Sequence, residues 1–210
     1  NSSSQFMMSA SDQLTFLPLG GAGEIGMNLN LYGLGPPNQQ TWVMVDLGIT
    51  FGNNSIPGVN IIMPDPKFIE SRRDKLAGLI LTHAHEDHIG AVPYLWERLQ
   101  CPIYATPFTT SILKRKLAET DFYKQVKINQ ISLGSRFKVG PFDMELITLT
   151  HSIPEPNAIA IRTPLGNILH TGDWKFDPSP VVGNVSDKET LSKLGDEGVL
   201  ALICDSTNVF

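Results

Sequence analysis

The amino-acid sequence predicts a layered α/β fold, in which β-sheets are covered by helices. Segments with strand-like patterns lie toward both ends of the 210-residue chain. Between them, residues 89–99 and 108–119 place apolar side chains three and four positions apart, as amphipathic helices do. The hydrophobic content of 41% is sufficient for a sizeable core. These three observations favour sheets packed against helices over an all-helical or all-strand fold.

The predicted strands are short apolar or alternating segments bounded by Gly, Pro and Asn. In chain order they span residues 14–19, 28–32, 42–45, 76–81, 102–105, 126–131, 142–149, 158–162, 167–171 and 199–204. Residues 163–166, Thr-Pro-Leu-Gly, predict a hairpin turn between two of them. Residues 48–66 are rich in Gly, Asn and Pro, which predicts a long surface loop.

The length fits one domain. Residues 1–11 are Ser-rich and are interpreted as a tag or a disordered N-terminus, so the domain is assigned to residues 12–210. Residues 205–208 form a polar segment after a strand, where another element should begin. We therefore expect the chain to be the N-terminal portion of a longer protein.

Charge and cysteine content limit the partners and the compartment. The formal net charge is −5, so a polyanionic substrate would be attracted by a local cationic patch or by metal ions. Two widely separated cysteines, Cys101 and Cys204, predict reduced thiols in a cytoplasmic protein. Because no apolar segment approaches the roughly 18 residues that span a bilayer, no membrane partner is expected.

The strongest chemical signal is residues 82–88, Thr-His-Ala-His-Glu-Asp-His. In an extended loop alternate side chains point the same way, so His83, His85 and Asp87 should converge, and His88 can turn inward where a helix begins. Imidazoles with a carboxylate are ligands preferred by zinc, with manganese or iron as alternatives. Four such groups exceed what one tetrahedral ion takes from a single loop, so a pair of ions sharing a water or hydroxide is predicted.

Two further ligands are predicted at the ends of other strands. His151 follows the strand that begins at residue 142, and Asp173 follows the strand 167–171 through Gly172. Both lie where a loop leaves a sheet edge, which is where site residues collect. The remaining histidine, His170, is expected to form a hydrogen bond at its strand end and not to bind metal.

This pattern of ligands resembles the metallo-β-lactamase superfamily over nearly all of residues 14–208. The motifs are H-x-H-x-D-H at 83–88, the lone His151, and His-Thr-Gly-Asp at 170–173. The resemblance implies a four-layer αββα sandwich with its site at one edge of the two sheets. It assigns His83, His85 and His151 to the first metal, Asp87 and His88 to the second, and Asp173 to both.

Asp46 closes a predicted strand and matches the superfamily's first motif, an aspartate that supports the histidine loop without binding metal. An ordinary surface turn residue is the alternative for this position.

Five stretches resemble the ribonuclease J group within the superfamily: residues 17–28, 83–91, 151–155, 170–175 and 205–208. The resemblance implies a β-CASP domain inserted after the last strand and a further histidine ligand beyond residue 210. The second metal site would then be incomplete in this chain, which we expect to be weakly active or inactive alone. The implied substrate partner is RNA, and we expect a homo-oligomer for the full-length protein.

The implied reaction is phosphodiester hydrolysis by 5′-to-3′ exonuclease and endonuclease action, in RNA maturation and decay. Two zinc ions, with Mn²⁺ as the alternative, would supply a hydroxide that attacks phosphorus in line. Asp87 or Asp173 could orient this nucleophile.

Other functions compete with this interpretation. Residues 21–26 satisfy G-x-G-x-x-G and Asp46 lies 20 residues further on, as in dinucleotide-binding folds. However, a strand-like segment follows, and Pro36-Pro37 prevents the required helix, so this reading is rejected. A lactonase, thioesterase or β-lactamase would use the same metals, although Asp87 argues against the zinc β-lactamases. A non-catalytic scaffold and a DNA-repair nuclease of the same superfamily are further alternatives.

Overall fold

A computed structural model describes residues 12–19, 28–51, 61–147, 158–171, 196–198 and 201–204. Within these ranges, the side chains of Glu86 and Asp87, of the short strands β4 and β5, and of β13 are not described. Residues 1–11, interpreted above as a tag or a disordered end, lie outside the described residues.

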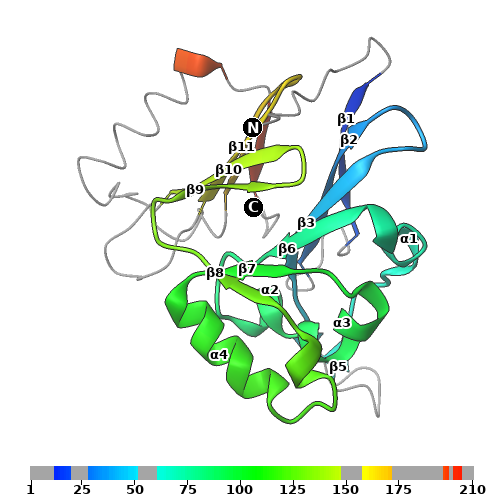
Figure 1. Cartoon of the computed structure of the whole chain (residues 1–210), viewed down its shortest axis with the longest axis vertical. Helices are drawn as coiled ribbons and strands as arrows, with labels where there is room; N and C mark the ends of the chain where they lie inside the picture. Colours follow the sequence, from blue (N-terminus) through cyan, green and yellow to red (C-terminus); the bar gives the residue numbers. More distant parts are fainter. Residues whose placement is uncertain are drawn as a thin grey trace, which may run out of the picture.

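The first sheet has six strands, which lie side by side in the order β1, β2, β3, β6, β7 and β8 (Figure 1). Their bounds are β1 Gln13–Pro18, β2 Leu29–Gly35, β3 Thr41–Leu47, β6 Leu76–Ile80, β7 Ile103–Ala105 and β8 Ile128–Gln130. The first three pair antiparallel, whereas β3, β6, β7 and β8 run parallel. The strand predicted after the G-x-G-x-x-G segment at residues 21–26 is therefore confirmed as β2, and residues 28–47 as described contain no helix.

The second sheet has the order β13, β12, β11, β10 and β9. The bounds are β9 Arg136–Val139, β10 Phe142–Ile147, β11 Ala158–Thr163, β12 Gly166–Thr171 and β13 Ala201–Cys204. The predicted turn is confirmed, because Thr163 pairs with Gly166 and the Thr163 Oγ1 accepts from the Gly166 N–H at 3.1 Å. Strand β9 was not predicted. The loop prediction for 48–66 was wrong in part, because β4 (Thr50–Phe51) and β5 (Ile61–Ile62) pair there.

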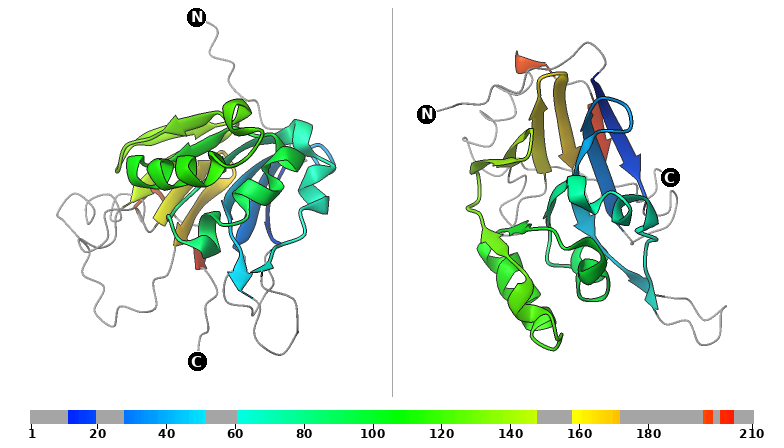
Figure 2. Two further views of the ribbon diagram at one scale, coloured as in Figure 1. Left: turned by 90° about the horizontal axis from the view of Figure 1, so that it is seen from below. Right: turned by 45° about the vertical axis from the view of Figure 1, so that its right-hand side comes forward.

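The helices lie on the outer side of the first sheet, away from the second (Figures 1 and 2). They are α1 Lys67–Glu70, α2 Glu86–Ile89, α3 Val92–Leu99 and α4 Pro107–Leu117, with 3-10 turns η1 Arg73–Lys75 and η2 Tyr123–Gln125. The helix predicted from residue 89 is thus divided, and α3 starts with a proline in its first turn, where proline is favoured. None of the described helices has the length and apolar character needed to cross a membrane.

Alternate side chains of β3 point to opposite faces of the first sheet and belong to two different core clusters. Trp42 and Met44 pack with α3 and α4, whereas Val43 and Val45 point to the second sheet. This is the period of two expected for a strand buried on both faces. A smaller apolar cluster around Ile147 and Ala158 lies on the opposite face of the second sheet. The described residues therefore supply one helical layer and two sheets, as the predicted αββα sandwich requires.

Cys101 lies in the core between the helices and the first sheet. Burial raises the pKa of its thiol to about 12. At pH 8 the reactive thiolate is therefore scarce in the folded chain, and the folded state should lose stability as the pH rises from about 9 toward 12. We expect Ellman's reagent at pH 8 to label the Cys204→Ser variant far more slowly when folded than in urea. Equal labelling rates would contradict the burial of Cys101.

Candidate metal centre

Parallel pairing brings Asp46 and the histidine loop to one edge of the first sheet. Val45 of β3 pairs with Ile80, the last residue of β6; Asp46 follows within β3, and Thr82 lies two residues past the end of β6. Asp46 and Thr82 are thereby brought together although 36 residues separate them in the chain. This edge is the carboxyl end of the parallel strands, where site residues tend to collect in open α/β sheets.

Asp46 is completely buried and has left-handed backbone geometry, with φ +66°. Aspartate and asparagine tolerate this region better than most residues. Its Oδ1 accepts from the Thr82 backbone N–H at 2.8 Å, and its Oδ2 accepts from the Thr82 hydroxyl at 2.7 Å. Oδ2 also contacts His88 Nδ1 at 2.8 Å. The surface-turn alternative for Asp46 is therefore excluded.

The surroundings of Asp46 favour its ionised form. Burial acts to raise the pKa of this carboxyl, but the charge and hydrogen bond of His88, with His83 and the Thr82 amide, hold the pKa below its ordinary value. An ionised carboxylate only accepts hydrogen bonds, so His88 must carry its proton on Nδ1. When His88 is neutral, as a metal ligand must be, its buried Nε2 atom carries the lone pair that binds the ion.

Thr82 sets the tautomer of His83 in the same way. Its hydroxyl has one proton, which it donates to Asp46, so it accepts from His83 Nδ1 at 2.9 Å. His83 therefore also presents a lone pair on Nε2. One buried carboxylate thus sets the tautomers of two histidines, directly for His88 and through Thr82 for His83, which is how supporting residues commonly orient metal ligands.

The histidine rings lie close together at this edge. The ring centroids of His83 and His88 are 4.4 Å apart, and those of His83 and His85 are 6.2 Å apart with planes inclined by 17°. His83 and His88 are buried, whereas His85 is exposed. The donor set of adjacent neutral imidazoles beside a carboxylate fits a divalent metal such as zinc.

The extended-loop interpretation of Asp87 was wrong. Helix α2 begins at Glu86, and the amides of His88 and Ile89 bond to the carbonyl of His85 at 2.9 and 3.0 Å. Asp87 and His88 are consecutive residues of this helical turn, so alternation along a strand does not place them. The side chain of Asp87 lies outside the described residues, and its ligand role stays a prediction.

His151 and Asp173 also lie outside the described residues. Among the side chains that the structure describes, no three His, Cys, Asp or Glu groups converge in a metal-binding arrangement. The set of six ligands therefore remains a prediction. The structure places the rings of His83 and His88 together, with the ring of His85 beside them.

His170 has the hydrogen-bonded position expected for it. It is buried at the end of β12, and its Nδ1 lies 2.6 Å from the hydroxyl of Tyr32 on β2. This contact joins the two sheets. Sequence reasoning missed Tyr32 and Thr82, because their partners His170 and Asp46 are 138 and 36 residues away. The only available signal for Thr82 was its position directly before His83.

Replacement of Thr82 by valine should destabilise the chain by about 1–3 kcal/mol, because a buried imidazole N–H and a carboxylate oxygen lose their shared partner. Valine keeps the shape and the backbone bond to Asp46. Urea unfolding of Thr82→Val and Thr82→Ser measures the effect, since serine retains the hydroxyl. Equal losses in both variants would show that the methyl group, and not the hydroxyl, is important.

Comparison with known proteins identifies the family and the fold of the chain. Residues 34–197 match the metallo-beta-lactamase superfamily. Among solved structures, a quorum-quenching N-acyl homoserine lactone hydrolase aligns with a TM-score of 0.55 and 17% identity, covering 94% of this chain and 93% of that one. The metallo-beta-lactamase fold protein YhfI from Bacillus subtilis aligns with a TM-score of 0.53 and 17% identity, covering 80% of this chain and 65% of that one. Identities this low show the shared fold.

Relatives with higher identity carry the name Ribonuclease J. The protein from Sinorhizobium meliloti is 49% identical over 96% of this chain and 36% of its own length. Those from Helicobacter pylori and Thermus thermophilus are 41% and 38% identical, over 91% and 94% of this chain and 27% and 35% of their own lengths. The chain thus spans about a third of these relatives.

The resemblance to the ribonuclease J group is therefore confirmed at the level of sequence, and the predicted sandwich at the level of fold. Because the family match extends over well more than half of the residues, the chain belongs to the metallo-β-lactamase superfamily.

Proposed function

We propose that the chain forms the metal-binding part of a ribonuclease that hydrolyses RNA phosphodiesters with two divalent metal ions. The observation that supports this most strongly is its 38–49% identity to proteins named Ribonuclease J, over more than nine-tenths of its residues. The buried network of Asp46, Thr82, His83 and His88 supports a metal site at the sheet edge.

The proposed ligands are those predicted from the sequence. His83, His85 and His151 would hold the first ion, Asp87 and His88 the second, and Asp173 both, with zinc as the preferred metal and Mn²⁺ as the alternative. When bound, such ions make water nucleophilic near neutral pH and offset the charge of the phosphate. Further residues that complete the second site would come from outside this chain.

The described residues orient the histidine rings and exclude water from one side of the proposed metal site. Asp46 orients His88 through its Nδ1 atom, and Thr82 orients His83 in the same way. Because Asp46, Thr82, His83 and His88 are all buried, this side of the site is shielded from solvent. A shielded site strengthens the interaction between its charges and a bound phosphate.

A small-molecule hydrolase is the less supported alternative. It rests on a fold shared with N-acyl homoserine lactone hydrolases at 17% identity, which carries no information about substrate. We also propose that the intact protein is a cytoplasmic homo-oligomer.

The test incubates the intact protein with a 5′-monophosphorylated RNA, with nitrocefin and with a thioester, before and after treatment with EDTA. We expect hydrolysis of the RNA alone, its loss in EDTA, and its return when Zn²⁺ or Mn²⁺ is added. Turnover of nitrocefin or the thioester without cleavage of RNA would overturn the proposal. Activity that persists after complete removal of metal would overturn the metal assignment.

A further inference from the structure

Basic residues concentrate in α4 and the segment that follows it. Residues 107–130 contain two acidic and five basic residues, the latter being Lys114, Arg115, Lys116, Lys124 and Lys127. This segment has a local charge of +3 in a chain whose formal net charge is −5. The segment is therefore locally basic, although the chain as a whole is acidic.

Several of the arginines elsewhere are neutralised by carboxylates. Arg98 pairs with Glu70, Arg136 pairs with Asp143, and Arg162 bridges Glu145 and Glu197. Each of these pairs cancels a positive charge locally.

Four cations of the α4 region differ from them. Lys114, Arg115, Lys124 and Lys127 are exposed, and no carboxylate among the described residues forms an ion pair with them. Their charge is therefore available to an anionic partner.

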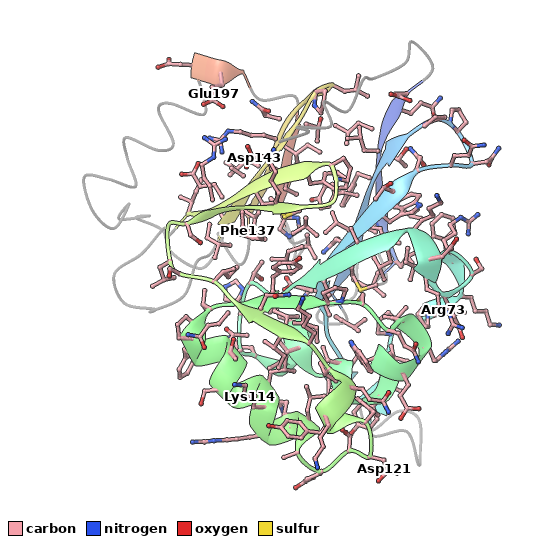
Figure 3. The ribbon with its side chains drawn as sticks, viewed as in Figure 1. Arg73, Lys114, Asp121, Phe137, Asp143 and Glu197 are labelled. Carbon is pink, nitrogen blue, oxygen red and sulfur yellow. The ribbon has the colours of Figure 1, made fainter. Side chains whose placement is uncertain are left out.

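Helix α4 presents two of these charges, Lys114 and Arg115, together with an aromatic ring. Leu113 and Leu117 are buried in the core, whereas Phe108, Lys114 and Arg115 point outward, and Phe108 is 50% exposed. Figure 3 labels Lys114 on the outer side of α4, with Asp121 beyond the end of the helix and Arg73 on the opposite flank of the molecule. The outer face of α4 therefore combines positive charge with a π-surface.

The same combination recurs after the helix. Tyr123 is 39% exposed and precedes Lys124. Beside them is a cavity of about 270 Å³, lined by Trp96, Gln100, Cys101, Pro102, Gln125 and Lys127. Amide side chains at its rim offer donors and acceptors to the edge of a planar ring.

The surface begins at the edge that carries the metal centre. Strands β6 and β7 are parallel, and the Leu81 amide bonds to the Tyr104 carbonyl at 3.0 Å. The histidine loop and the start of α4 therefore leave the sheet at the same edge. Helix α4, about 16 Å long at 1.5 Å per residue, then leads from Phe108 to Tyr123 and Lys127 on the other side.

A purely structural role explains part of this pattern. Lys114, Arg115 and Lys116 occupy the last turn of α4, where cations stabilise the helix dipole. That role does not account for Lys124 and Lys127, nor for two exposed aromatic rings beside the charges.

We propose that the α4 cationic surface, formed by Phe108, Lys114, Arg115, Tyr123, Lys124 and Lys127, binds single-stranded RNA that extends from the metal centre. The identification of the polymer as RNA rests on the proposed function. Positive grooves with exposed aromatic rings are the usual means of holding single strands, because cations contact phosphates and the rings stack on bases. The surface would supply the local attraction that the acidic chain lacks as a whole.

The experiment measures binding of a fluorescent 20-nucleotide RNA to the intact protein in EDTA, where metal-dependent cleavage is absent. One variant changes Lys114, Arg115, Lys124 and Lys127 to Gln. A matched variant changes Lys67, Arg73, Lys75 and Lys138 to Gln, which removes four exposed charges elsewhere. We expect the first variant to bind at least tenfold more weakly, with a salt slope reduced by about 2–3, at roughly 0.7 per phosphate contact. The matched variant should change affinity less than threefold.

Equal losses in the two variants, or no loss in the first, would overturn the proposal.

Phe108→Ala with Tyr123→Ala should weaken binding about fivefold or more, by loss of stacking. An unchanged affinity in this double variant would remove the aromatic part of the assignment. Equal weakening of double-stranded DNA binding would overturn the preference for single strands. A four-nucleotide substrate that reaches only the metal centre should be cleaved normally by the lysine and arginine variant, which separates this surface from the proposed catalytic function.

Discussion

Replacement of Asp46 by alanine should lower the free energy of unfolding by about 3–5 kcal/mol. This is the usual cost of removing one member of a buried, charged hydrogen-bond network. The carboxylate accepts three hydrogen bonds, two from Thr82 and one from His88, and all three residues are buried. Alanine would leave these donors without their acceptor. It would also adopt a φ of +66° that it tolerates poorly. Since domains are stable by about 5–15 kcal/mol, this single change should approach the limit of folding.

Asp46→Asn separates the effect on folding from the effect on metal binding. Asparagine tolerates the left-handed backbone, and its Oδ1 can still accept from the Thr82 amide. Its Nδ2 would donate to His88 Nδ1 and to the Thr82 hydroxyl, which could then donate to His83. Both histidines would take the tautomer with a proton on Nε2, which is unsuited to binding metal.

We therefore expect Asp46→Asn to fold while binding Zn²⁺ about 10–100-fold more weakly, as is typical for loss of a supporting partner. Two-bond ¹⁵N–¹H couplings report the tautomer of each histidine, and calorimetric titration with Zn²⁺ reports the affinity. If the variant binds zinc like the parent, with unprotonated Nε2 atoms, then Asp46 does not set the tautomers.

Much of the first sheet could be predicted because its central strands are apolar on both faces. Residues 42–45 and 76–81 are strongly apolar and bounded by polar residues, which is typical of strands buried between two layers. Strand β9 escaped prediction because it has four residues, Arg-Phe-Lys-Val, two of them charged. Its identity as a strand depends on pairing with β10, which local sequence does not encode.

The candidate site was predictable in composition and less so in geometry. His83, His85 and His88 stand out by their spacing, but the extended loop assumed for Asp87 gave way to the helical turn that begins at Glu86. The role of Thr82 depends on its contact with Asp46, which the parallel register of β3 and β6 creates. No pattern within residues 82–88 could show that contact.

If the proposed function holds, replacement of His83 by alanine should reduce RNA hydrolysis by the intact protein about a thousandfold, because loss of this proposed metal ligand would remove several kcal/mol of transition-state stabilisation. His83 is buried, its ring is 4.4 Å from that of His88, and its Nδ1 is hydrogen-bonded to the Thr82 hydroxyl. Activity against 5′-monophosphorylated RNA and the number of zinc ions bound per chain are measured together. We expect both to fall.

Tyr32→Phe is the matched control for this prediction. It removes the hydroxyl 2.6 Å from His170, which is also a buried histidine at a strand end. Loss of this one hydrogen bond should cost about 1 kcal/mol of stability. Zinc content and hydrolysis should stay near those of the parent, because neither group belongs to the proposed ligand set. If His83→Ala and Tyr32→Phe reduce activity equally and in proportion to their stability, then loss of folding explains both, and His83 is not a metal ligand.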